Sequence, residues 1–392
     1  MMKKNVLFVI PTMESGGVEV GFLEFARKNF EKKDINIFLL AAGGAMLSRI
    51  KHYDVQHIAF GVDTKNPFAI FRNIEKIKNV IRENRIDIVQ VESRAPAWSC
   101  FYACRALDVP LITVVQFNGL FRRSLFPKKF YNSIMFRGNP VVAVSNFVRQ
   151  FVQDNYRGYI RGKASGTIRV IPRGIDIGVY SQEAVPQNRK VVIQNEMKLP
   201  DDKIIITLPG RFAPQKGQEY FVDVLKYLKS DNYFCLLVGD TKKNPEYVER
   251  VRRRIYKHNL QGCVKIHDNI NDMPALYVLS NIVVSASVQP ESFGRTSIEA
   301  QAMGKIFLGT ALGGTLETVS DGETGFLAPK NNARGFAVIL DRVINLPADE
   351  KQLIAEKSKQ NVIDNYSFEK MYCRMIDIYN RIDDYERFWH RH

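Results

Sequence analysis

The chain has 392 residues, of which 45% are hydrophobic and 25% charged, and its formal net charge at pH 7 is +15. A chain of this length and composition is expected to form a soluble globular protein with two domains. Its longest apolar runs are too short to span a membrane, and residues 1–4 lead into a short strand without a signal peptide. We therefore expect a cytoplasmic protein. The five cysteines lack the spacing of a metal site, which fits a reducing compartment.

In the first half of the chain, short apolar runs typical of buried strands alternate with helical patterns. The predicted strands are residues 6–10, 35–40, 86–91, 111–115, 141–144 and 168–171, and the predicted helices are 18–30, 70–83, 97–107 and 146–155. This alternation predicts βαβ units, and therefore a parallel sheet with helices on both faces.

A second series of the same kind follows a polar connector that contains Pro186 and Pro200. Its predicted strands are residues 203–208, 233–238, 263–266, 282–285 and 306–309, again with helices between them. We therefore predict an α/β protein with two Rossmann-like, doubly wound domains that face each other across a cleft. The N-terminal domain is expected over 1–185 and the C-terminal domain over 200–365, with an amphipathic helix in 366–392.

The positive charge is concentrated in residues 111–173, which hold eleven Lys and Arg residues against one acid, Asp154. This segment supplies ten of the fifteen net charges, which predicts an acidic partner such as anionic lipid, a phosphorylated acceptor or nucleic acid. Within it, residues 121–131 interleave aromatic side chains with four cations: Arg122, Arg123, Lys128 and Lys129. Membrane-surface helices have this composition, and so do solvated basic faces and nucleic-acid sites. We expect an anionic membrane surface and no nucleic acid, because no nucleic-acid-binding fold accompanies the segment.

The most informative stretch, residues 281–304, has the pattern of a buried strand, a polar loop and a helix. In an open α/β sheet, this arrangement places the loop at the ligand crevice. Glu291 lies in the loop and Glu299 lies about two helical turns further on, with the expected helix start near Phe293 and Gly294 between them. The free N–H groups of a helix start favour phosphate, while carboxylates accept hydrogen bonds from hydroxyl groups. This combination suits a sugar nucleotide.

The same stretch resembles the E-x7-E signature of the group 1 (family 4) retaining glycosyltransferases. Phe293-Gly294, Ala300 and Met303-Gly304 accompany the two Glu residues at the offsets of the family. Two more loops resemble family motifs, and each follows the first strand of its domain. One contains Gly16-Gly17, and the other, residues 210–217, contains Arg211 and Lys216.

The resemblance implies a GT-B fold and a retaining enzyme that moves a sugar from a nucleotide-sugar donor to a glycan or glycolipid acceptor. The implied pathway is bacterial lipopolysaccharide or envelope polysaccharide synthesis, and the C-terminal helix is implied to return to the N-terminal domain. Arg211 and Lys216 are implied to bind the donor diphosphate, which gains negative charge as the glycosidic bond breaks. Because these cations replace the electrostatic role of a metal, no metal is expected.

Further roles are carried over residue by residue. Glu291 is implied to hold the hydroxyls of the donor sugar, and Glu299 those of the ribose. The remaining implied donor-binding residues contribute backbone groups or small turns at the sugar and phosphates: Gly16, Gly17, Phe293, Gly294, Arg295 and Thr296.

The chain departs from the family pattern at Asn118, where many members have a His close to the anomeric carbon. Asn can donate and accept hydrogen bonds but cannot titrate, so a His-dependent step would be missing. Asn118 remains a candidate for donor binding. Arg94, just after the predicted strand 86–91, is a candidate acceptor contact, and the neighbouring Trp98 suits either an acceptor or the core.

Two alternatives remain at this stage. The first is a non-catalytic GT-B scaffold that binds a nucleotide and docks on a membrane or partner. Asn118 supports it, whereas the four motif residues Glu291, Glu299, Arg211 and Lys216 argue against it. The second is a sugar-nucleotide epimerase of the same fold, for which no catalytic acid–base set is evident. We expect a transferase located peripherally on the inner face of the cytoplasmic membrane.

Overall fold

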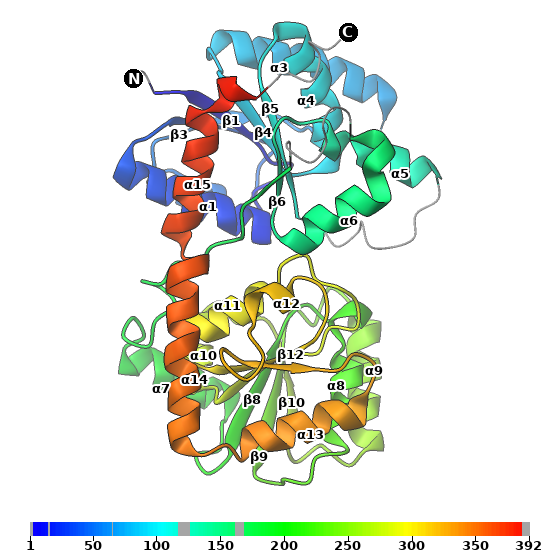
Figure 1. Ribbon diagram of the computed structural model, residues 1–392, viewed down its shortest axis with the longest axis vertical. Coiled ribbons are helices and arrows are strands. Elements are labelled where there is room, and N and C mark those ends of the chain that lie inside the picture. Colours follow the sequence, from blue (N-terminus) through cyan, green and yellow to red (C-terminus); the bar gives the residue numbers. More distant parts are fainter. Residues whose placement is uncertain (1–2, 15, 65, 117–125, 161–167, 386–392) are drawn as a thin grey trace. The chain divides into compact units, whose positions relative to one another are not determined.

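The computed structural model describes residues 3–14, 16–64, 66–116, 126–160 and 168–385. The chain forms two compact units, each an α/β structure with a parallel sheet (Figure 1). The first unit comprises Met1–Gly174 and Phe368–His392, and the second comprises Ile175–Ser367. Among the described residues, no helix has both the length and the apolar composition needed to cross a bilayer.

The sheet of the first unit has the strand order β3-β2-β1-β4-β5-β6-β7, and neighbouring strands pair in parallel. The strands are β1 (Asn5–Val9), β2 (Asn36–Ala41), β3 (Val55–Ala59), β4 (Ile88–Val91), β5 (Leu111–Val115), β6 (Val141–Ala143) and β7 (Ile168–Val170). The helices between them are α1 (Gly17–Lys32), α2 (Leu47–Ile50), α3 (Pro67–Glu83), α4 (Arg94–Leu107), α5 (Phe126–Ser133) and α6 (Asn146–Tyr156).

The sheet of the second unit has the order β10-β9-β8-β11-β12-β13 and is also parallel. Its strands are β8 (Ile204–Pro209), β9 (Tyr233–Val238), β10 (Val264–His267), β11 (Ile282–Ser285), β12 (Ile306–Thr310) and β13 (Phe326–Ala328). Its helices are α7 (Gln187–Met197), α8 (Gln218–Leu225), α9 (Pro245–Lys257), α10 (Met273–Leu279), α11 (Arg295–Ala302), α12 (Thr315–Thr318), α13 (Ala333–Ile344) and α14 (Ala348–Asn361).

Both faces of the second sheet are buried under helices. On β9, Cys235 and Leu237 belong to a core shared with α8, α9 and α13, whereas Leu236 and Val238 belong to a second core shared with α7, α10 and α11. Successive side chains of a strand point to opposite faces, so a strand covered on both faces needs a continuous apolar run. This requirement explains the apolar runs from which the strands were predicted.

The order of strands reverses at one point in each sheet. In the first unit β1 lies between β2 and β4, and in the second unit β8 lies between β9 and β11. Ligands of open α/β sheets bind at the carboxyl ends of the strands that flank such a switch point. The relevant loops therefore follow β1 and β4 in one unit, and β8 and β11 in the other.

The structure differs from the sequence-based expectations at the sheet edges and at the boundary. The edge strands β3 and β13 were not predicted, because β3 exposes Gln56 and His57 and β13 is only three residues long. The polar connector expected near residues 180–200 contains helix α7, which belongs to the second unit. Its apolar side chains Ile193 and Met197, one turn apart, are buried in the core of that unit, so the division falls after Gly174 rather than at residue 185.

The last helix, α15 (Phe368–Asn380), belongs to the first unit and runs beside α1 (Figure 1). The ring of Tyr372 packs on Phe25 with a centroid distance of 4.9 Å. The Tyr372 hydroxyl lies 3.0 Å from Asn29 Oδ1 and 2.9 Å from Asp34 Oδ2. The C-terminal helix thus completes the core of the unit in which the chain begins.

Candidate active site

Two loops meet at the switch point of the second unit. Gly217, which precedes α8, has a φ of 72°, and a Cβ atom built on it would lie 2.0 Å from the carbonyl oxygen of Ala286. The Val288 N–H donates a hydrogen bond of 3.0 Å to the Gln215 carbonyl. Only glycine permits this combination of backbone angle and close approach. The loop after β8 is therefore held directly against the loop after β11.

This contact brings Lys216 and Glu291 together, although they are 75 residues apart. Lys216 Nζ donates a hydrogen bond of 2.8 Å to Glu291 Oε1, and only 20% and 12% of the two side chains are exposed. The hydroxyl of Ser287 donates to the same carboxylate oxygen, and that of Ser285 does so over 3.4 Å. The lysine thus lies beside a carboxylate that is itself fixed by two hydroxyl groups.

The electrostatic surroundings keep Glu291 ionised. Burial acts to raise the pKa of Glu291, but the charge of Lys216 and the hydrogen bonds from Lys216, Ser287 and Ser285 outweigh it and hold the pKa below its ordinary value of 4.5. The site therefore places a carboxylate next to the side-chain amine of Lys216, which suits a ligand that presents a hydroxyl group and a phosphate next to each other.

The backbone of Glu291 is held from the other side by the loop after β12. Gly314 N–H donates 2.8 Å to the Glu291 carbonyl. A Cβ atom would lie 2.6 Å from the Glu291 oxygen if added to Gly313, and 2.6 Å from Phe293 Cα if added to Gly314. Gly313 also has a φ of 63°. These two glycines allow the loops to pack without side chains between them.

Helix α11 begins directly after this loop. Gly294 is its N-terminal cap with a φ of 87°, a left-handed conformation that favours glycine. The ring of Phe293 is buried and lies 5.7 Å from that of Tyr366, so only its backbone is available to a ligand. The N-terminal end of α11, whose first turn includes Arg295 and Thr296, is the positive end of the helix dipole and therefore favours an anion.

Glu299 lies on the second turn of α11 and is fixed by two donors. The Tyr277 hydroxyl donates 2.8 Å to Oε2, and Arg295 Nε donates 2.8 Å to Oε1. Burial, with the charge of Glu299, raises the pKa of Tyr277 well above its ordinary value, so the phenol stays neutral and continues to donate. The carboxylate is 12% exposed and keeps free lone pairs for a ligand hydroxyl.

Arg211 follows β8 on the same edge of the sheet. Its side chain is exposed, and within the described part of the chain it has no hydrogen-bond or ion-pair partner. The structure therefore brings Lys216, Glu291, Gly294 and Glu299 into one connected set of loops, with Arg211 as a free cation on the loop of Lys216.

In the first unit, Gly16 caps α1 with extended backbone and Gly17 is its first residue, so both lie where β1 gives way to the helix. Arg94 starts α4, and its Nη1 donates 2.9 Å to Asn132 Oδ1. Trp98 is buried against Phe130 and belongs to the core.

The basic segment is described only in part. Lys128 is exposed and Lys129 half-buried on α5. Asn118, Arg122 and Arg123 lie outside the described residues.

Sequence reasoning missed the hydroxyl groups that orient the two carboxylates, namely Ser285, Ser287 and Tyr277. The two serines interrupt an otherwise apolar run close to Glu291, which is a signal that was available. The described residues contain no group of three or more His, Cys, Asp or Glu side chains placed to hold a metal ion.

Comparison with known families agrees with the site. Residues 191–360 match the family described as glycosyl transferases group 1, and residues 15–179 match glycosyltransferase family 4. A crystal structure of a glycosyltransferase from Rickettsia africae is 35% identical to this chain, covers 97% of it and 98% of its own length, and has a TM-score of 0.87. The chain therefore belongs to the group 1, family 4 glycosyltransferases, and its predicted family, its α/β fold class and its identity as a glycosyltransferase are confirmed.

More distant relatives have more specific names. The capsular polysaccharide biosynthesis glycosyltransferase CapM of Staphylococcus aureus is 22% identical over 97% of this chain and 98% of its own. A lipopolysaccharide 1,2-N-acetylglucosaminetransferase of Salmonella typhimurium is 24% identical over 59% of each chain. The Anabaena protein Alr3699/HepE, solved with UDP and glucose, is 18% identical over 96% of this chain and 99% of its own, with a TM-score of 0.81, and shares the fold.

Proposed function

We propose that this glycosyltransferase transfers a sugar from a nucleoside-diphosphate sugar with retention of anomeric configuration. The observation that carries the proposal is the Lys216–Glu291 pair at the switch point, with Glu299 held on the adjoining helix. Lys216 and Arg211 would stabilise the charge that develops on the departing diphosphate. Glu291 would accept hydrogen bonds from the donor sugar, Glu299 would accept them from the ribose, and the start of α11 would bind phosphate.

The relatives supply the first candidates for the donor and the acceptor. The Anabaena structure with UDP and glucose makes UDP-glucose the first donor to test. The names of the S. aureus and S. typhimurium relatives support a bacterial surface polysaccharide or lipopolysaccharide as acceptor. We propose that no metal is required, because the charges of Lys216 and Arg211 supply the stabilisation that a divalent ion provides in other transferases.

Nucleotide binding and turnover test this proposal together. Calorimetry in the presence of EDTA should give binding of one of UDP, GDP and ADP to the wild-type protein. The matching nucleotide sugar should be turned over in the same buffer, and proton NMR should show a product with the anomeric configuration of the donor. Glu291→Gln should keep nucleotide affinity and lose turnover by about 10²-fold or more, because it removes a charge oriented at the reacting sugar.

Two outcomes would contradict the proposal. If none of the three nucleotides binds, the donor site is not functional, and the non-catalytic scaffold becomes the better explanation. If Glu291→Gln turns over at the wild-type rate, the carboxylate has no part in transfer. Neither alternative is favoured, because a nucleotide-binding scaffold needs no carboxylate fixed for the donor sugar, as Glu291 is, and the described residues of the site include no acid–base set for an epimerase.

We further propose that the protein docks on the inner face of an anionic membrane through helices α3 and α5. Phe68 and Phe71 at the start of α3 are 87% and 72% exposed, and Phe130 on α5 is 47% exposed beside Lys128. Both helices pack on α4: Ser99 donates 3.2 Å to the Ile70 carbonyl, and Trp98 lies 5.4 Å from Phe130. Exposed aromatic groups with nearby cations are typical of interfacial membrane contacts.

Vesicle sedimentation checks the docking surface. At low salt, the wild-type protein should sediment with vesicles rich in phosphatidylglycerol and not with pure phosphatidylcholine vesicles. The double variant Phe68→Ser/Phe71→Ser should reduce the bound fraction at least about fivefold, because each buried aromatic ring contributes well over 1 kcal/mol. The control is Leu353→Ser, which replaces a 52% exposed leucine on α14 of the other unit. This variant should bind the vesicles as the wild type does. Equal binding of all three proteins would contradict this surface.

A further inference from the structure

The first unit has an ion pair at its own switch point, formed by residues that no family motif assigned. Glu92 follows β4, and Arg173 follows β7 where the chain leaves the unit. Arg173 Nη2 donates 3.0 Å to Glu92 Oε2, and the side chains are 18% and 11% exposed. In burial and in length, the pair closely matches Lys216–Glu291 of the second unit.

Other polar groups hold Glu92 in place. Gln116 Nε2 donates 2.6 Å to Oε2, and Gln90 Nε2 donates 3.1 Å to Oε1. Gln90 in turn accepts 2.6 Å from the hydroxyl of Tyr379 on α15. Three of the roughly four lone-pair positions of the carboxylate are therefore used, and one is left.

Arg173 uses a smaller share of its hydrogen-bonding groups than Glu92 does. A guanidinium has five N–H donors, and within the described residues one bond, to Glu92, is found. Its Nη1 lies close to the backbone of α1, since a Cβ atom added to Gly21 would be 3.1 Å away. A side chain at position 21 would occupy the space beside the guanidinium, which glycine leaves open.

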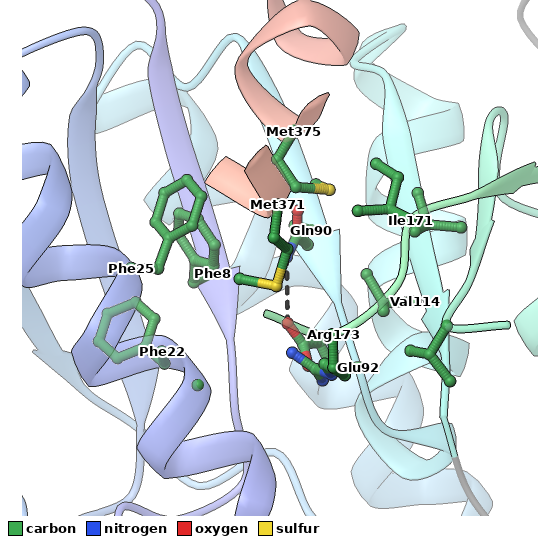
Figure 2. A pocket seen from close by; sticks show the side chains of 13 residues that line it. Phe8, Phe22, Phe25, Gln90, Glu92, Val114, Ile171, Arg173, Met371 and Met375 are labelled. Carbon is green, nitrogen blue, oxygen red and sulfur yellow. Dashed lines mark hydrogen bonds and ion pairs between the residues drawn. The ribbon is translucent and has the colours of Figure 1, made fainter. Parts of the chain in front are cut away.

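The pair lies at one end of a small cavity (Figure 2). Phe8, Phe22 and Phe25 line one side, Val114 and Ile171 the other, and Met371 and Met375 of α15 approach from above. The cavity volume is about 30 Å³, enough for a water molecule or for a hydroxymethyl group, because a single water needs roughly 10–15 Å³ of such space. Its apolar walls suit a methylene group and its polar end suits an oxygen.

The chemistry of the pair selects the ligand. A phosphate or carboxylate would meet the Arg173 donors but would be repelled by Glu92, which lies at hydrogen-bond distance from them. A hydroxyl group can donate to the free lone pair of Glu92 and accept from Arg173 at the same time. The pair is therefore complementary to a neutral sugar hydroxyl.

We propose that Glu92 and Arg173 bind the hydroxymethyl group of the acceptor sugar and so contribute to acceptor specificity. This inference rests on the proposed transferase function, and it assigns to the first unit a site for an uncharged pyranose. Both residues act by binding, and neither is given a part in bond cleavage.

The two methionines of the cavity provide a direct readout. The protein is labelled with ¹³C at its methionine methyl groups, and methyl α-D-glucopyranoside, its 6-deoxy analogue and inorganic phosphate are titrated separately. The glucopyranoside should shift the Met371 and Met375 resonances, while Met197, buried in the second unit, stays unchanged. The 6-deoxy sugar should bind about tenfold more weakly, because it loses a hydrogen bond to charged groups, and phosphate should cause no shift.

Variants test the two residues. Glu92→Gln and Arg173→Lys should each weaken glucopyranoside binding about tenfold. An unchanged signal of Met135, which is buried in the first unit, serves as evidence that this unit is folded. Glu75→Gln, which removes a surface ion pair of α3, should bind as wild type does. Three results would overturn the inference. The 6-deoxy sugar could bind as tightly as the glucopyranoside, or phosphate could shift the methionine resonances more than the glucopyranoside does. The third is that the glucopyranoside shifts neither Met371 nor Met375. Nucleotide calorimetry on the same samples tests the donor site in the other unit separately. If a nucleotide binds but the glucopyranoside does not, the inference fails while the proposed function stands.

Discussion

Replacing Lys216 with methionine is expected to lower turnover by about 10²- to 10³-fold, the effect of removing one group that stabilises transition-state charge. The substitution keeps the length of the side chain but removes the cation 2.8 Å from Glu291 and the positive charge available to the diphosphate. Nucleotide affinity should also fall, which distinguishes this variant from Glu291→Gln. Steady-state turnover and calorimetry measure the two effects.

The same variant should change the pH dependence of stability. In the wild type, the lowered pKa of Glu291 contributes stability above pH 4.5, and this contribution is lost as pH falls through the folded-state pKa. Burial is the largest single influence on the pKa of Glu291, so we expect this pKa to rise when the charge and hydrogen bond of Lys216 are removed. The variant should then be less stable than wild type by about 3 kcal/mol at pH 7, and the difference should shrink as pH is lowered through the raised pKa.

Urea unfolding followed by far-ultraviolet circular dichroism at pH 7 and pH 5 measures this difference. Lys216→Arg should retain most of the stability because it keeps the charge. Lys242→Met removes an 88% exposed lysine that lies 4.0 Å from Asp268, and it should have little effect. A stability loss in Lys216→Met that is equal at both pH values would show that Glu291 is not the group responsible.

The largest structural effect is expected from Gly217→Ala. The backbone of Gly217 has a φ of 72°, which costs about 1–2 kcal/mol for a residue with a Cβ atom. The added carbon would also lie 2.0 Å from the Ala286 carbonyl oxygen, so the two loops must separate. We expect a total loss of at least about 3 kcal/mol in unfolding free energy. Because the separation moves Lys216 away from Glu291, turnover should fall together with stability.

Gly322→Ala is the matched control in the same unit. Gly322 has a similar φ of 77°, but a Cβ atom there meets nothing within 4 Å. It should therefore show the cost of the backbone angle alone, about 1 kcal/mol, with normal turnover. If both variants lose the same stability, the contact with Ala286 does not hold the loops together.

The interior strands and the edge strands β7 and β10 could be predicted from the sequence, whereas the edge strands β3 and β13 could not. Runs such as 233–238 and 282–284 are apolar throughout because both faces of their sheet are covered. Strand β3 exposes two consecutive polar residues, Gln56 and His57, at an edge of its sheet. Helix α7 places two of its side chains, Ile193 and Met197, in the apolar core. Neither pattern stands out from that of a loop in a single sequence.

For the site, the sequence by itself determined which residue types stand where a strand gives way to a helix. The motif positions Lys216, Glu291, Gly294 and Glu299, the glycines of the loops and the concentration of charge in 111–173 are all local features. The tertiary structure alone decided the partners: Lys216 with Glu291, Tyr277 with Glu299, and Glu92 with Arg173, 81 residues away. The physical reason is that each pair depends on the order of the parallel strands in the sheet, because that order decides which loops meet at a switch point. The local periodicity of a sequence does not specify the strand order.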